Sequence, residues 1–266
     1  MIEFSLLGSG SAGNAVFVRA PTGKILIDNG LSLRQLQLRL ERIGESLDRL
    51  AAIVVTHEHG DHVKGVGVLA RKTGVPVYLT RETDANLRDI GKIPEKMYFE
   101  PGEVLRILDF QLSSFRVAHD AVDPVSFAVW RAGCQLGLAT DLGHACNVVR
   151  QRLRGSHALV LESNYCPDMI QRSPYPPAIV QRIRSKHGHL SNQDMCSLLA
   201  SLLHDDLQWV VAVHVSQQNN TAEKARLMAQ QVLADHPAKL YVADQDEPSP
   251  LMRIESPAAL ALGQTA

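Results

Sequence analysis

Three histidines and an aspartate, all able to bind a metal ion, occur within six residues in the first quarter of the chain. The segment reads His57-Glu58-His59-Gly60-Asp61-His62. Imidazole and carboxylate groups are ligands that zinc, manganese and iron accept. The alternative is a solvent-exposed loop rich in histidine, but three histidines and an aspartate at such spacing rarely coincide when only 11 of 266 residues are histidine. The segment therefore predicts a metal centre.

The spacing within this segment favours two metal ions over one. Four ligands in six residues cannot all turn toward a single ion without strain, whereas alternating residues can face two neighbouring ions. His57 and His59 then point toward one ion, and Asp61 and His62 serve the other.

Apolar strands are the elements expected to hold these ligands and others like them. The run Ala52-Ile53-Val54-Val55 leads directly into the histidine loop. Three further ligand-type residues each follow an apolar run, namely His119, Asp141 and His214. Each could merely cap a turn, but with the loop they approach the roughly seven to eight protein ligands that a pair of ions needs.

The rest of the chain alternates short strands with amphipathic helices, which predicts an α/β fold. Strands are expected at residues 2–7, 15–19, 24–27, 52–55, 75–79, 104–107, 110–117, 125–130, 135–140, 158–162, 209–213 and 239–242, and helices at 31–43, 65–73, 148–153, 177–187, 192–203 and 222–234. We expect two sheets packed face to face with helices outside, forming one domain over residues 1–243. The proline-containing tail 244–266 is predicted to be irregular.

Composition and charge exclude several other classes of protein. Hydrophobic residues make up 45% of the chain and charged residues 21%, as in ordinary globular proteins. The net charge of -1 gives no global attraction for a polyanion, so a nucleic-acid substrate would depend on local contacts and metal ions. Glu3 stands where a signal peptide would be basic, and no apolar run is long enough to span a membrane. The cysteines Cys134, Cys146, Cys166 and Cys196 form no CxxC pair, so we expect reduced thiols in a cytoplasmic protein.

Taken in order, the ligand-type residues resemble the motifs of the metallo-β-lactamase superfamily. Those motifs are matched by Asp28, the loop from His57 to His62, His119, Asp141 and His214. The resemblance implies an αββα sandwich with the metal site at one edge. It also implies that His57, His59 and His119 bind one ion, that Asp61, His62 and His214 bind a second, and that Asp141 bridges them. Asp28 would hold the histidine loop in place.

Further strings resemble the YycJ (WalJ)-like group of this superfamily. They are Leu7-Gly8-Ser9-Gly10-Ser11-Ala12-Gly13-Asn14, His119-Asp120-Ala121, Gly188-His189-Leu190-Ser191-Asn192 and His214-Val215-Ser216-x-x-Asn219-Asn220. This resemblance implies a DNA exonuclease. One departure is Tyr165, a tyrosine where that group has a histidine.

Residues around the proposed metals are candidates for contact with substrate. His189 precedes a helix that Ser191 would cap, and helix N-termini favour anions, so His189 is expected to touch a phosphate or protonate the leaving oxygen. Substrate binding is expected from Ser9, Ser11, Asn14, Ser191, Asn219 and Asn220, although turns and helix caps without a ligand are the alternative. The pattern Gly8-x-Gly10-x-x-Gly13 matches a dinucleotide fingerprint, but the residues after it alternate like a strand, so nicotinamide binding is rejected.

The function expected is therefore hydrolysis that depends on two divalent ions, Zn²⁺, Mn²⁺ or Fe. A hydroxide bridging the ions would be the nucleophile, with Asp61 orienting it and His189 assisting catalysis. The leading hypothesis is a phosphodiesterase that digests DNA from an end. One alternative is a small-molecule hydrolase acting on a cyclic phosphodiester, lactone or thioester. The other is a non-catalytic metal-binding regulator.

Overall fold

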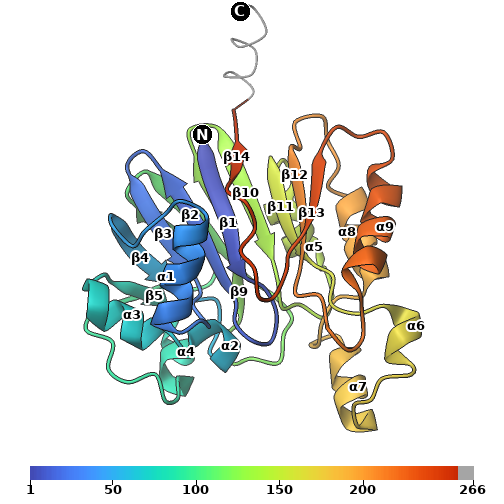
Figure 1. Cartoon of the computed structure of the whole chain (residues 1–266), viewed down its shortest axis with the longest axis horizontal. Helices are drawn as coiled ribbons and strands as arrows, with labels where there is room; N and C mark the ends of the chain where they lie inside the picture. Colours follow the sequence, from blue (N-terminus) through green and yellow to red (C-terminus); the bar gives the residue numbers. More distant parts are fainter. Residues whose placement is uncertain (257–266) are drawn as a thin grey trace, which may run out of the picture.

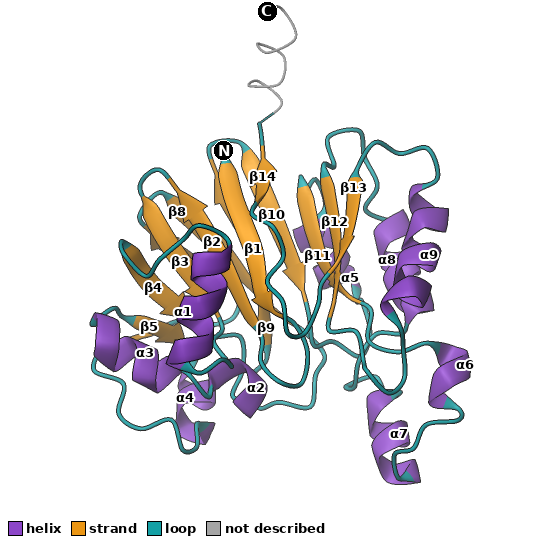
Figure 2. Cartoon of the chain, viewed as in Figure 1, coloured by secondary structure: helices purple, strands orange, loops and turns teal. Residues whose placement is uncertain are grey.

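Two β-sheets pack face to face, and helices cover both outer faces (Figures 1 and 2). The computed structural model describes residues 1–256. In spatial order, the first sheet contains β14 (Met252–Ile254), β1 (Ile2–Gly8), β2 (Ala15–Ala20), β3 (Gly23–Ile27), β4 (Leu50–Val54), β5 (Val77–Leu79) and β6 (Lys96–Tyr98). The second contains β13 (Lys239–Val242), β12 (Trp209–Val213), β11 (Ala158–Glu162), β10 (Cys134–Ala139), β9 (Val125–Arg131), β8 (Phe110–Arg116) and β7 (Val104–Ile107). The expected αββα sandwich is confirmed.

The helices form the two outer layers. They are α1 (Leu33–Arg42), α2 (Gly60–Val63), α3 (Val66–Thr73), α4 (Arg81–Asn86), α5 (Asn147–Leu153), α6 (Pro167–Ile170), α7 (Pro177–Ile183), α8 (Asn192–Ala200) and α9 (Ala222–Leu233). In α1, the Ser32 side chain accepts a hydrogen bond from the backbone N–H of Gln35, which caps the helix start. Leu36 and Leu40 are buried on its inner face and pack with side chains of the first sheet.

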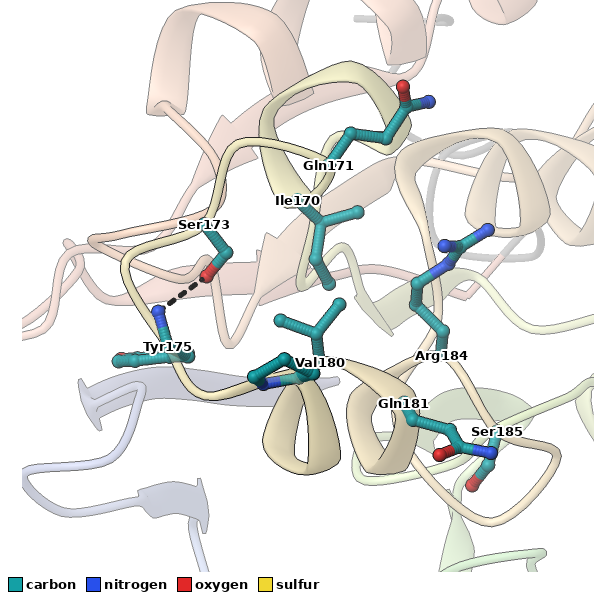
Figure 3. A pocket seen from close by; sticks show the side chains of 9 residues that line it. Ile170, Gln171, Ser173, Tyr175, Val180, Gln181, Arg184 and Ser185 are labelled. Carbon is teal, nitrogen blue, oxygen red and sulfur yellow. Dashed lines mark hydrogen bonds between the residues drawn. The ribbon is translucent and has the colours of Figure 1, made fainter.

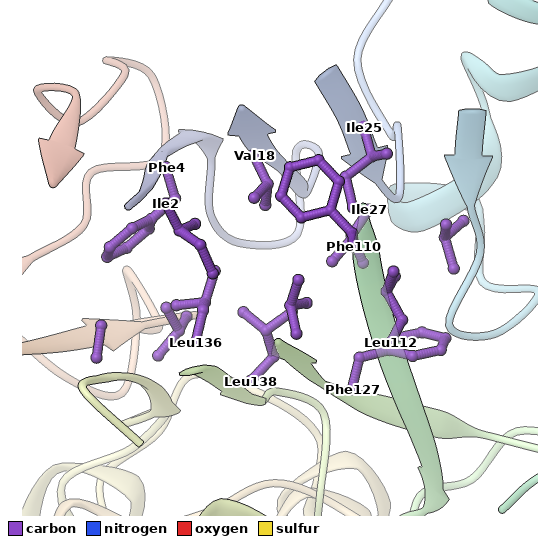
Figure 4. Close-up of a cluster of buried hydrophobic side chains, with 14 of the residues drawn as sticks. Ile2, Phe4, Val18, Ile25, Ile27, Phe110, Leu112, Phe127, Leu136 and Leu138 are labelled. Atoms are coloured by element: carbon purple, nitrogen blue, oxygen red, sulfur yellow. The ribbon is translucent and has the colours of Figure 1, made fainter. Parts of the chain in front are cut away.

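The main hydrophobic core fills the space between the sheets. Phe4 and Ile27 from the first sheet join the same buried cluster as Phe110, Phe127 and Leu138 from the second (Figure 4). A second cluster lies between β10–β12 and helices α5, α8 and α9, and a third lies beneath α1 and α3. Each sheet is therefore covered on both faces, which explains why its central strands read as nearly continuous apolar runs.

The strand directions bring the ends of distant strands to one edge of the sandwich. Strands β3 and β4 are parallel in the first sheet, as are β10, β11 and β12 in the second. Strand β8 runs in the same direction as β10, because both are antiparallel to β9. The carboxyl ends of parallel strands are where α/β folds place their ligands. Residues that follow these strands are therefore candidates for a common site.

Several short elements differ from the prediction. The tail was expected to be irregular from residue 244, but Met252–Ile254 form β14 and pair with β1, so that expectation is wrong for these residues. The remainder of the tail prediction, residues 257–266, lies outside the described residues. The predictions also omitted α2, α4, α6 and β6, each of which spans six residues or fewer. Elements of this length carry too few residues to establish a period.

The glycine-rich segment after β1 leads into a strand, as expected. Residues Ala15–Ala20 form β2, which is antiparallel to β1, so no helix begins there to receive a pyrophosphate. Within residues 1–256, none of the helices is both long enough and apolar enough to cross a membrane.

Candidate metal centre

The histidine loop begins after β4 and is held by backbone hydrogen bonds to two distant residues. The N–H of Asn14 donates to the carbonyl of Asp61 at 2.7 Å, and the N–H of Asn29 donates to the carbonyl of His62 at 2.8 Å. His59 lies at the N-cap position of α2. These contacts fix where the four side chains of the loop point.

Gly30 allows the chain to pass close to the histidine loop. A Cβ atom at this position would lie 1.7 Å from the carbonyl oxygen of Asp61, a separation that no packing tolerates. We expect Gly30→Ala to displace the loop and to weaken metal binding about 10- to 100-fold, the range seen when partners of metal ligands are lost. Metal titration monitored by calorimetry measures this effect. Gly60→Ala is the matched control, because a Cβ there meets no atom within 4 Å; equal metal affinity in the two variants would contradict the prediction.

Asp28 connects the loop to β3 through three hydrogen bonds. Its carboxylate accepts from the N–H of Thr56 at 2.8 Å, from the hydroxyl of Thr56 at 2.7 Å and from Nδ1 of His62 at 2.8 Å. The Thr56 hydroxyl in turn accepts from Nδ1 of His57 at 2.9 Å. Asp28 therefore contacts His62 directly and His57 through the Thr56 hydroxyl.

Three histidines form the first group of potential ligands. Nε2 of His57 lies 3.1 Å from Nδ1 of His59, and Nε2 of His119 lies 3.3 Å from the same atom. Nδ1 of His119 donates to the carbonyl of Gly188 at 3.1 Å, so its Nε2 lone pair is directed into the group. Burial lowers the pKa of His57 well below its usual range, which keeps the ring neutral. Neutral imidazoles with converging nitrogen atoms are what a metal ion requires.

Asp141 joins this group to a second one. One of its oxygens lies 3.3 Å from Nε2 of His62, and the other lies 3.0 Å from Nδ1 of His214. The ligand atoms of His57, His62 and Asp141 lie within 4.8 Å of one another. A second set of ligand atoms, also within 4.8 Å of one another, comes from Asp141, Glu162, His189 and His214. Asp141 and His57 each belong to two groups, so the groups are contiguous.

Three of these residues have a left-handed backbone. Asp28, Asp141 and His214 follow β3, β10 and β12 with φ values of 60°, 55° and 54°. Residues other than glycine adopt such angles at a cost of about 1 kcal/mol or more and often do so at functional sites. In each case the turn comes directly after the strand, which directs the side chain into the common site.

Glu162 is a site residue that the sequence-based prediction missed. Its Oε1 accepts from Nδ1 of His189 at 2.6 Å and lies 3.0 Å from Nδ1 of His214. Burial opposes its ionisation, but His189 and His214 outweigh that effect and lower its pKa to about 2. Glu162 is the last residue of the apolar strand β11. The rule that singled out Asp141 and His214, a ligand-type residue ending an apolar run, would also have found it.

Other predicted residues lie next to the groups without belonging to them. Oδ2 of Asp61 accepts from Nδ2 of Asn14 at 2.9 Å and lies 3.5 Å from Nε2 of His62. Nδ2 of Asn14 is also 3.0 Å from that nitrogen of His62. Ser9 is buried, and its hydroxyl accepts from the backbone N–H of His214 at 2.7 Å. Asn14 and Ser9 thus position the predicted ligands.

The remaining predicted substrate residues divide between the surface and the interior. Ser11 is exposed and lines a hollow that His189 and His214 also border. Ser191 caps α8 by accepting from the N–H of Asp194. Asn219 is fully buried, and Asn220 is buried with its amide donating to the carbonyl of Ser163. Neither asparagine, nor Ser191, lines that hollow.

A sandwich with clustered histidines and carboxylates at one edge is the arrangement of a metallohydrolase fold. Similarity to known proteins agrees with this assignment. The sequence signature of the metallo-β-lactamase superfamily matches residues 8–185, and the chain belongs to this superfamily. The exodeoxyribonuclease YycJ of Bacillus anthracis is 37% identical over 237 residues, covering 88% of this chain and 90% of that protein. The exodeoxyribonuclease WalJ of Streptococcus pneumoniae is 32% identical over 263 residues, covering 95% and 98%. The predicted resemblance to the YycJ (WalJ)-like group is confirmed.

A solved structure supports the fold independently. The metallo-β-lactamase fold protein YhfI from Bacillus subtilis superposes with a TM-score of 0.73 at 15% identity, covering 94% of this chain and 99% of that one. A sequence identity of 15% supports a similar fold and carries no conclusion about function. The superfamily and the clustered side chains together establish a fold that binds divalent metal ions.

Proposed function

We propose that this chain is a metal-dependent phosphodiesterase that removes nucleotides from a DNA end. The observation that carries the proposal is the contiguous set of histidines and carboxylates in which Asp141 faces His62 with one oxygen and His214 with the other. The two relatives named exodeoxyribonucleases, which match nearly the full chain, support DNA as the substrate.

The donor set fits two divalent ions, Zn²⁺, Mn²⁺ or Fe. His57, His59 and His119 would hold one ion, Asp61, His62 and His214 the second, and Asp141 would bridge them. The structure supports this fit because Nδ1 of His57, of His62 and of His119 each has a hydrogen-bond partner outside the cluster, so that Nε2 points inward. Mixed imidazole and carboxylate ligation suits all three metals.

When bound, the ions would supply Lewis acidity, which activates water and stabilises the phosphate charge. The protein's own contribution to proton transfer is the pair formed by His189 and Glu162. Nδ1 of His189 donates to Oε1 of Glu162, so the imidazolium form of the ring can give its Nε2 proton to the leaving oxygen and return to the neutral form. Asp61, whose Oδ2 is held by Asn14, is placed to orient water near His62.

Cationic side chains lie in two hollows next to the site. Lys64 and Arg88 line a hollow of about 550 Å³ that His59, Glu58 and Asp89 also border. Arg182 lines the hollow of His189 and His214 and is paired with Asp120. These three cations are the candidates for phosphate contacts along a strand.

The test is digestion of end-labelled DNA by the purified protein with Mn²⁺ or Zn²⁺. We expect mononucleotides or short products from single-stranded or double-stranded oligonucleotides, with the label released progressively from an end. A cyclic dinucleotide, a lactone and a thioester serve as competing substrates. Turnover of only these small molecules would refute the nuclease proposal, and no turnover of any substrate by protein carrying two ions would favour a metal-binding regulator.

A further inference from the structure

A hollow of about 460 Å³ opens beside the candidate metal centre. His189 and His214 line this hollow, and so do Tyr175 and Ile179. Tyr175 and Ile179 are each 39% exposed, so their apolar surfaces are accessible. The hollow therefore offers an apolar surface to a ligand that reaches the metal centre.

Tyr175 is held by an unusually stiff segment between α6 and α7. The sequence is Ser173-Pro174-Tyr175-Pro176-Pro177, and each proline fixes its own φ angle and restricts the residue before it. The backbone N–H of Tyr175 also donates to the hydroxyl of Ser173 at 3.2 Å. A backbone restricted in this way loses little conformational entropy when a ligand covers the residue.

Tyr175 also borders a second hollow, of about 760 Å³, whose lining includes none of the candidate metal ligands. Ile170 and Val180 meet in that hollow, and the Tyr175 side chain extends away from them (Figure 3). Arg184 lines the second hollow and Arg182 the first. Arg182 is fixed by an ion pair of 2.8 Å between its Nε and Oδ2 of Asp120. Each of the two hollows that Tyr175 borders is therefore lined by apolar side chains and by an arginine.

We propose that Tyr175 and Ile179 form a stacking platform for the base of an unpaired nucleotide next to the scissile phosphate, with the strand continuing past Arg182 and Arg184. The proposal rests on the proposed DNA hydrolysis and specifies its substrate as a DNA end with unpaired bases. A base can lie on an aromatic side chain only when it has left the duplex stack, and every base offers such a face. The platform therefore binds an unpaired terminal base without selecting sequence.

The test compares Tyr175→Ala and Tyr175→Phe with the wild-type protein carrying its metal ions. Stacking on an aromatic ring contributes enough that we expect Tyr175→Ala to raise KM for a single-stranded oligonucleotide about 10-fold. The phenylalanine variant should retain the wild-type KM, because the ring is kept. Trp130→Ala is the control, since Trp130 is 41% exposed on β9 and lies outside both hollows. The metal content, measured by elemental analysis, should be equal in all variants.

A binding measurement separates stacking from turnover. A phosphorothioate oligonucleotide with 2-aminopurine at its 5′ or 3′ end should lose fluorescence on binding wild-type protein and Tyr175→Phe, but not Tyr175→Ala. An unchanged KM and unchanged quenching in Tyr175→Ala, while the wild type digests DNA, would overturn the platform alone. Failure of the wild type to digest any DNA would instead overturn the proposed function.

Discussion

Asp141→Asn is expected to lose at least one metal ion per chain and at least about 100-fold in kcat/KM on DNA. The carboxylate of Asp141 is the group that faces both sets of ligands, with its two oxygens 3.3 Å from Nε2 of His62 and 3.0 Å from Nδ1 of His214. An amide presents only one acceptor oxygen and carries no charge, so it cannot serve both sides. Elemental analysis of reconstituted protein and the DNA digestion assay measure the two effects.

Asparagine is the informative replacement because of the backbone at this position. The φ of Asp141 is 55°, a conformation that asparagine tolerates and alanine adopts only with strain. Asp109→Asn is the control, since Asp109 pairs with Arg131 at the start of β8, whereas the site lies beyond the other end of that strand. Full metal content and unchanged turnover in Asp141→Asn would refute the bridging assignment.

His189→Gln is expected to lower kcat about 10²- to 10⁴-fold while leaving the metal content unchanged. His189 is largely buried and is fixed by the 2.6 Å hydrogen bond from its Nδ1 to Glu162, whose pKa of about 2 keeps that carboxylate charged. Glutamine can form a similar hydrogen bond but cannot deliver a proton. The loss should therefore fall on the chemical step, which single-turnover kinetics measure.

A change of leaving group tests this assignment more sharply. The p-nitrophenyl ester of thymidine 5′-phosphate releases a weakly basic phenolate that needs no proton, so His189→Gln should hydrolyse it at nearly the wild-type rate. An equal loss on this ester and on DNA would argue against proton donation. Loss of a metal ion from the variant would show that His189 is a ligand, since its Nδ1 lies within the same group of potential ligand atoms.

The secondary structure followed from sequence wherever a segment was long enough to carry a period. Helices such as α1 and α9 bury side chains at a helical spacing, and strands such as β8 and β12 bury nearly continuous runs. Both patterns are visible in the residues themselves. Strand β14 was missed because its three residues are defined by pairing with Ile2, Glu3 and Phe4, about 250 positions away. Pairing over such a distance leaves no local signal.

The sequence by itself predicted the metal-binding chemistry of this protein, because the ligand-type residues of the histidine loop are adjacent and the single ones follow apolar strands. Only the tertiary structure decided which polar residues meet those ligands. Ser9 holds the backbone of His214, and Glu162 contacts both His189 and His214. These residues come from different strands of both sheets, and the parallel strand order alone brings the strand ends to one edge. The stacking platform proposed at Tyr175 and Ile179 likewise became apparent only from its position beside that edge.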